Sequence, residues 1–198
     1  MLKALLGWYE KNKRQLPWRQ THDPYSIMVS EFMLVQTTVA TVEKRYESFL
    51  EKFPSLKSLA RAPLWKVQKA WSGLGYYSRA VNLWKACQEI NRLGRFPSNP
   101  EELKTLPGFG PYLARAVASI AFNVAAPVMD TNVRRVLLRI FGADDPGLSE
   151  ALMSQSKSSP SKFNQAFMEL GALVCKSKKP QCFSCPVRSS CATQGIHP

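Results

Sequence analysis

Apolar residues recur along most of this chain at the three- and four-residue spacing of amphipathic helices. Residues 1–15 place four apolar side chains on one face, and two proline-containing segments then interrupt the pattern. Helical spacing returns in the ranges 25–53 (as two helices), 55–60, 64–74, 78–93, 98–106, 112–122, 132–141 and 161–174. No stretch alternates as a strand would, so we predict an all-α fold, with residues 142–161 as its most linker-like part.

Charge narrows the class of partner. The 198 residues carry 27 Lys and Arg against 14 Asp and Glu, a net charge of +13, and such an excess attracts phosphate backbones. A merely soluble basic protein remains open on charge alone. No apolar run reaches the ~18 residues of a membrane helix, and the N-terminus is too short and interrupted for a secretory signal. We therefore expect no membrane association and a cytoplasmic location.

The five cysteines are unevenly placed. Cys87 stands alone in a helical pattern and reads as a small buried apolar residue. The others crowd the C-terminal region with spacings of six, two and five residues, as Cys175, Cys182, Cys185 and Cys191. In a cytoplasmic chain such a cluster more often binds metal than forms disulfides. Four thiolates suit a [4Fe-4S] cluster or a tetrahedral zinc ion.

A glycine-rich turn, Leu106–Tyr112, lies between two helical patterns. Gly108 and Gly110 permit the unusual backbone of a tight hairpin. The amides that start the following helix would suit a DNA phosphate, although an ordinary helix–turn–helix connection fits the same residues. Further along, Asp130 precedes an arginine-containing helix and is well placed to be its N-cap.

The hairpin, the aspartate and the cysteine spacing together resemble the helix-hairpin-helix DNA glycosylase superfamily, in its endonuclease III and adenine glycosylase branch. The resemblance implies a two-lobed all-α fold with its active site between the lobes. One lobe, residues 24–130, would be a six-helix barrel with the helix-hairpin-helix, and the other would join residues 1–23 to 131–198. It also implies a structural [4Fe-4S] cluster that helps DNA binding.

Nearly the whole chain resembles the MutY-type adenine glycosylases. The matching segments are Leu16–Arg19, Asp23–Tyr25, Val29–Leu34, Gly73–Arg79 and Phe163–Ala172. The resemblance implies excision of adenine mispaired with guanine or 8-oxoguanine. Tyr112 stands where bifunctional members carry the lysine that forms a Schiff base, and a phenol cannot do that chemistry. Water rather than lysine would therefore attack the sugar.

Glu31 lies within an otherwise apolar run, where burial would raise the pKa of a carboxyl group. A poised acid is what purine release requires, because protonating N7 turns adenine into a leaving group. The resemblance makes Glu31 the general acid and Asp130 the anion that stabilises the oxocarbenium-like sugar. It assigns support of this pair to Tyr112 and Asn132, the lining of the adenine pocket to Trp18, Arg19 and Glu169, and the filling of the space left by the flipped base to Gln36 and Tyr76.

Three features depart from the adenine glycosylase pattern. The segment after Leu34 reads Val35-Gln36-Thr37-Thr38, Thr131 follows the aspartate in place of glycine, and the chain ends seven residues after Cys191. It is either an isolated catalytic domain or a naturally short relative. Short relatives include the thymine/uracil mismatch glycosylases, which are the main alternative. A non-catalytic DNA-binding or redox protein is another. For both kinds of glycosylase, we expect the partner to be double-stranded DNA with a mismatched or damaged base. We expect the protein to bind it as a monomer in the nucleoid.

Overall fold

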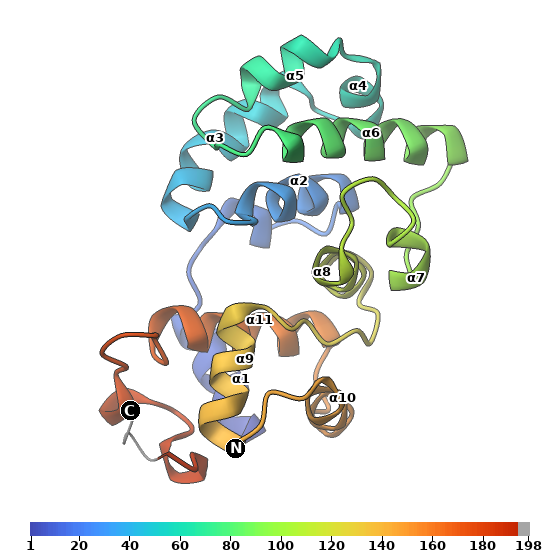
Figure 1. Ribbon diagram of the computed structural model, residues 1–198. Coiled ribbons are helices and arrows are strands. Elements are labelled where there is room, and N and C mark those ends of the chain that lie inside the picture. The colour runs from blue at the N-terminus through green and yellow to red at the C-terminus, as the bar shows by residue number, and fades with distance from the viewer. Residues whose placement is uncertain (194–198) are drawn as a thin grey trace. The chain divides into compact units, whose positions relative to one another are not determined.

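The computed structural model describes residues 1–193, and this part of the chain is entirely helical apart from its turns (Figure 1). Contacts divide the chain into two compact units, Gln15–Phe122 and Met1–Arg14 with Asn123–Pro198. The boundaries expected from sequence, 23/24 and 130/131, lie later in both connecting segments. Within residues 1–193, no helix combines the length and the apolar character needed to cross a membrane.

The unit Gln15–Phe122 is built around one nearly fully buried helix, α2 (Pro24–Leu34). Asp23 caps it through the amide of Ser26 at 2.9 Å, and Pro24 fits the first turn because its missing N–H is not needed there. The remaining elements are η1 (Pro17–Arg19), α3 (Val39–Lys52), α4 (Leu56–Arg61), α5 (Leu64–Ala70), α6 (Ser78–Leu93), α7 (Pro100–Leu103) and α8 (Pro111–Phe122). Helix α2 contacts α3, α6 and α8, so its side chains are buried on every face (Figure 1).

The second unit packs α1 (Leu2–Asn12) and α9 (Thr131–Phe141) on opposite parts of α11 (Pro160–Leu173). Helix α9 has a strong apolar stripe, because Val133, Val136, Leu137 and Ile140 recur at helical spacing and are all buried. They join Phe163 and other residues of α11 in one core. Two short helical turns, η2 (Cys182–Ser184) and η3 (Arg188–Ser190), lie in the cysteine-containing segment.

The all-α prediction is confirmed, but one helix was missed. Residues 142–161, expected to be linker-like, contain α10 (Pro146–Gln155). Asp145 caps this helix through the amide of Leu148, and Leu152 and Met153 bury its inner face. The aspartate–proline pair at its start was the available signal. The helix expected over 98–106 is also shorter than predicted, because α7 spans only Pro100–Leu103 and turns follow it.

Candidate functional site

Glu31 lies on the buried helix α2 and is only 3% exposed, so it is not a surface carboxylate. Its Oε2 accepts a hydrogen bond of 3.0 Å from the phenol of Tyr112, on the neighbouring helix α8. The two predicted catalytic residues of this unit, Glu31 and Tyr112, are therefore in direct contact. A buried carboxyl group that accepts a hydrogen bond from a phenol can accept or deliver a proton with little competition from water.

The hairpin before α8 packs directly on the helix that carries Glu31. The ring of Phe109 meets that of Phe32 edge-on, with 5.4 Å between centroids. Gly108 has a left-handed backbone, with φ +79°, and a Cβ there would lie 2.6 Å from Cβ of Asn82 on α6. Gly110, in contrast, has open space and no positive φ, and its amide donates to the carbonyl of Gly108. Only the first of the two glycines is thus required by the hairpin's backbone.

This difference predicts unequal effects of alanine at the two glycines. Gly108→Ala should destabilise the protein by about 2 kcal/mol or more, because the left-handed backbone alone costs a Cβ-bearing residue ~1–2 kcal/mol and the contact with Asn82 adds to it. Gly110→Ala should change stability by less than about 0.5 kcal/mol. Denaturant unfolding of the two variants measures the difference. Equal effects would show that the hairpin does not have this backbone.

Asp130 begins helix α9 as its N-cap, as the sequence predicted, and its Oδ1 accepts a 2.6 Å hydrogen bond from the amide of Val133. Its other oxygen, Oδ2, lies 3.4 Å from the side-chain nitrogen of Asn132. Burial raises the pKa of Asp130 above its ordinary value of 3.8, while the Val133 amide, the Asn132 side chain and the charge of Arg135 oppose that rise. The aspartate is therefore a desolvated acceptor held by Val133 and Asn132.

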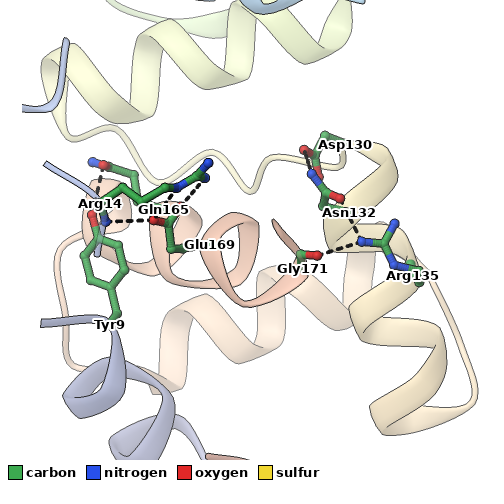
Figure 2. Close-up of polar contacts among 8 residues, drawn as sticks. All are labelled: Tyr9, Arg14, Asp130, Asn132, Arg135, Gln165, Glu169 and Gly171. Atoms are coloured by element: carbon green, nitrogen blue, oxygen red, sulfur yellow. Dashed lines mark hydrogen bonds and ion pairs between the residues drawn. The ribbon is translucent and has the colours of Figure 1, made fainter. Parts of the chain in front are cut away.

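A second layer of contacts holds Asn132 (Figure 2). Its side-chain oxygen accepts from Arg135, and the same guanidinium donates to the carbonyls of Gly171 and Cys175, each at 2.8 Å. A Cβ at residue 171 would lie 2.6 Å from Cβ of Asn132, so only glycine lets α11 approach this closely. The chain of contacts from Asp130 through Asn132 and Arg135 ends at the first of the clustered cysteines.

The segment leading to Asp130 is fixed by Asn164 of α11. The amide side chain of Asn164 accepts from the amide of Val128 and donates to the carbonyl of Ala126, each at 2.9 Å. This pair of bonds satisfies backbone groups that would otherwise be buried unpaired. Asn164 was not among the predicted site residues, yet it fixes the backbone that leads to Asp130, the N-cap of α9.

Glu169 is completely buried on α11 and forms an ion pair with Arg14 (Figure 2). The guanidinium donates from Nε to Oε1 at 2.9 Å and from Nη2 to Oε2 at 2.7 Å, and the Arg14 amide also donates to Oε1. One turn earlier on α11, Gln165 accepts a hydrogen bond from the phenol of Tyr9. Arg14, which the sequence did not single out, is thus the principal cation beside this predicted pocket residue within its own unit.

Trp18 and Arg19 lie in the single turn η1. Trp18 is buried and meets the ring of Tyr46 on α3 edge-on, with 5.3 Å between centroids. It is therefore a core aromatic, whatever else it contacts. Arg19 is half-buried. These two predicted pocket residues belong to the unit Gln15–Phe122, and Glu169 belongs to the other.

Gln36 and Tyr76 are both exposed, Tyr76 by 62%, so Tyr76 is not a packing aromatic of the core. Both have a left-handed backbone, with φ 56° and 44° respectively. Such a conformation is uncommon for residues other than glycine, and residues that adopt it cluster at functional sites. The sequence identified both residues, but it gave no sign of their shared backbone geometry.

The four clustered cysteines line one pocket with about 370 Å³ of empty space, which includes open solvent. Its other walls come from Arg139, Ile140, Leu170, Val174, Val187 and Arg188. Burial raises the pKa of the Cys185 thiol, and the neighbouring Cys175, Cys191 and Cys182 raise it further, against one hydrogen bond from the amide of Val187. In residues 1–193, however, no three metal-binding side chains approach closely enough to hold a single ion.

Two cations flank this pocket. Arg139 of α9 donates to the sulfur of Cys175 at 3.6 Å and to the carbonyl of Lys176 at 2.7 Å, while its own carbonyl accepts from the thiol of Cys191. Arg188 stacks over the ring of Phe183, which is almost fully exposed. Cys87 lies elsewhere and is fully buried, as predicted, and burial raises the pKa of its thiol.

Comparison with known proteins places the chain in a family. Residues 29–161 match the HhH-GPD superfamily of base excision DNA repair proteins. The human adenine DNA glycosylase is 43% identical over 95% of this chain, which spans only 38% of the human protein. A thermostable thymine-DNA glycosylase aligns with a TM-score of 0.89 and 28% identity, covering 99% of this chain and 95% of that one. A non-covalent endonuclease III–DNA complex aligns with a TM-score of 0.80 and 26% identity over 98% of this chain and 92% of that one. The chain therefore belongs to the HhH-GPD superfamily of base excision DNA repair proteins.

Proposed function

We propose that the chain is a DNA N-glycosylase that excises adenine mispaired with guanine or 8-oxoguanine by hydrolysis. The observation that carries the proposal is the buried Glu31, which contacts Tyr112 beside the hairpin in a chain 43% identical to the human adenine DNA glycosylase. Release of adenine needs an acid that protonates N7, and a carboxyl group shielded from water is suited to that task. Glu31 fills this role.

Asp130 supplies the negative charge that the developing sugar cation needs. Its carboxylate is desolvated, so it interacts more strongly with a nearby positive charge than it would in water. Asn132 and the Val133 amide fix its orientation. Tyr112 holds Glu31 and cannot form a Schiff base, so the reaction is hydrolysis by water without a lysine-dependent lyase step.

DNA is bound through phosphate contacts at the hairpin and with basic side chains, and the net charge of +13 supports this. Exposed Gln36 and Tyr76 enter the base stack where the adenine leaves it. We assign recognition of the adenine to Trp18 and Arg19 of one unit and to Glu169 of the other, whose carboxylate is fixed within its own unit by the ion pair from Arg14. Gly108 shapes the hairpin, whereas the part of Gly110 in binding DNA does not depend on a left-handed backbone angle.

The four cysteines of the pocket would hold a [4Fe-4S] cluster. One pocket lined by four thiols, spaced six, two and five residues apart along the chain, supports a [4Fe-4S] cluster. The cluster would stabilise this segment and the position of its basic side chains, and it takes no part in breaking the glycosidic bond.

Removing one cluster ligand tests this assignment. Cys182→Ser should lose most of the ~4 irons per chain expected for a [4Fe-4S] centre, together with its visible absorbance. Cys87→Ser should keep both the iron and the absorbance. Cys87 is buried in the unit Gln15–Phe122, whereas the four cluster cysteines belong to the other unit. Iron and zinc are measured on protein purified without oxygen. One zinc per chain without iron would contradict the cluster.

One other activity has a specific observation in its favour. The thymine-DNA glycosylase matches this chain over nearly its full length, and Thr37 and Thr38 resemble that branch. Against it stand the greater identity to adenine glycosylases, the segment Gly73–Tyr77 and Glu169. Excision of T:G or U:G mismatches is therefore the second candidate.

Four duplexes decide between the two activities. We expect single-turnover release of adenine from A:8-oxoG and A:G, read as strand cleavage after alkaline treatment, and no release from T:G or U:G. Activity on T:G or U:G alone would replace the proposal with the second candidate. Inactivity on all four duplexes, with duplex binding retained, would favour a non-catalytic DNA-binding protein.

A further inference from the structure

Arg79, in the first turn of α6, is a buried cation whose hydrogen bonds go to no carboxylate. Arg79 is only 8% exposed, and its guanidinium donates to five backbone carbonyls and one hydroxyl. Burial lowers the pKa of Arg79, yet a guanidinium keeps its charge in proteins. A buried charge of this kind is costly unless its donors are satisfied, so this arrangement calls for a reason.

The six acceptors lie on two segments that are far apart in the sequence. Nη1 donates to the carbonyls of Phe32, Met33 and Val35, which end helix α2 and lack helical partners. Nη2 donates to the carbonyls of Leu74 and Gly75 and to the hydroxyl of Thr37 at 2.8, 3.2 and 2.9 Å. One guanidinium thus joins the turn after α2 to the turn before α6.

The residues that follow two of these carbonyls are Gln36 and Tyr76. Arg79 binds the carbonyl of Val35, directly before Gln36, and the carbonyl of Gly75, directly before Tyr76. Both residues have a left-handed backbone, which is unfavourable for any residue that carries a side chain. The guanidinium also lies 5.6 Å from the Tyr76 ring centroid and 5.5 Å from that of Trp71. It therefore binds the peptide that precedes each of the two left-handed residues.

We propose that Arg79 is a positioning residue that holds Gln36 and Tyr76 as one rigid pair, so that both side chains enter the DNA base stack together. This inference rests on the proposed function. An exposed side chain that is already ordered loses less entropy when it inserts, and preorganisation therefore favours the flipped state. Lysine cannot replace Arg79, because its single ammonium has three donors and cannot span two diverging sets of carbonyls.

The first test uses the free protein and needs neither DNA nor activity. In Arg79→Lys, amide hydrogen exchange at Thr37 and Leu74, whose N–H groups are bonded within the two turns, should accelerate about tenfold or more. Exchange in α8 should stay within about twofold. The control is Arg95→Lys, an exposed arginine of the same unit paired with Glu102. Unchanged exchange in both turns, or equal acceleration throughout the unit, would overturn the proposal.

The second test measures base flipping, with 2-aminopurine placed beside the target adenine as a fluorescent reporter of stacking. Arg79→Lys should slow the fluorescence rise about tenfold, but it should have almost no further effect once Gln36 and Tyr76 are both alanine. Such non-additivity is expected when one residue acts only through the others. A slowing by Arg79→Lys that is just as large without the two side chains would overturn the proposal.

Thr37→Val is a milder variant for the case in which Arg79→Lys folds poorly. It removes one Arg79 acceptor and the weaker bond from the Thr37 hydroxyl to the Leu74 carbonyl. It should accelerate exchange in both turns, but by less than Arg79→Lys does. A lack of effect on exchange would count against the proposed role of Arg79. If wild-type protein excises no adenine, the proposed function fails, while the exchange result still decides whether Arg79 holds the turns.

Discussion

Glu31→Gln should nearly abolish adenine release while leaving duplex binding intact. Glutamine keeps the shape of the side chain and can still meet the phenol of Tyr112, but it has no acidic proton to give to the base. General acid catalysis contributes ~10²–10⁴-fold, so the single-turnover rate on A:8-oxoG should fall by that factor. Binding should change little, because phosphate contacts supply most of the affinity.

Two further variants separate the acid from its surroundings. Tyr112→Phe removes the hydrogen bond to Oε2 and should cost about tenfold, well short of the loss in Glu31→Gln. Glu47→Gln, on the exposed face of α3, should leave the rate unchanged. Full activity of Glu31→Gln on adenine would mean that another group is the acid.

Local patterns predicted most of the helices because many of them signal their own start. Asp23, Asp130 and Ser159 stand at N-caps, and apolar residues then recur at helical spacing. Helix α10 was missed because its serines, its glycine and its charged neighbours resemble a loop. Its only buried apolar side chains are those of Leu152 and Met153. Its burial depends on partners elsewhere in the chain, which a local window does not include.

The site was predictable where a residue type is itself unusual for its surroundings. Glu31 stands out as a carboxylate in an apolar run, and the cysteine spacing stands out as a set. Arg14, Arg79, Arg135 and Asn164 gave no such signal, because an arginine or asparagine in a polar stretch ordinarily faces water. Each becomes important only when folding brings backbone carbonyls or a buried carboxylate to it.

Asp130→Asn should lower the rate of adenine release by about 10²–10³-fold, because it removes a preorganised charge from the site. Asparagine is also a good N-cap, so its side-chain oxygen can still accept from the amide of Val133 and keep α9 intact. The matched control is Asp145→Asn, which makes the same change at the cap of α10. It should leave the rate unchanged, and a comparable loss there would trace the effect to capping rather than to charge.

The negative charge of Asp130 that should favour catalysis should also lower the stability of the folded protein. Burial raises the pKa of Asp130 above 3.8, so the folded protein holds this proton more tightly than the unfolded chain does. The stability contributed by the protonated group is therefore present below the unfolded value and is lost as pH rises through the folded value. Asparagine does not titrate, so the melting temperature of Asp130→Asn relative to wild type should increase as the pH rises from below 3.8 through the folded pKa of Asp130. Any fixed cost of placing an amide beside Asn132 cancels in that trend. A difference that stays flat or falls with pH would show that the aspartate is not desolvated, and would remove the physical basis for its role beside the sugar cation.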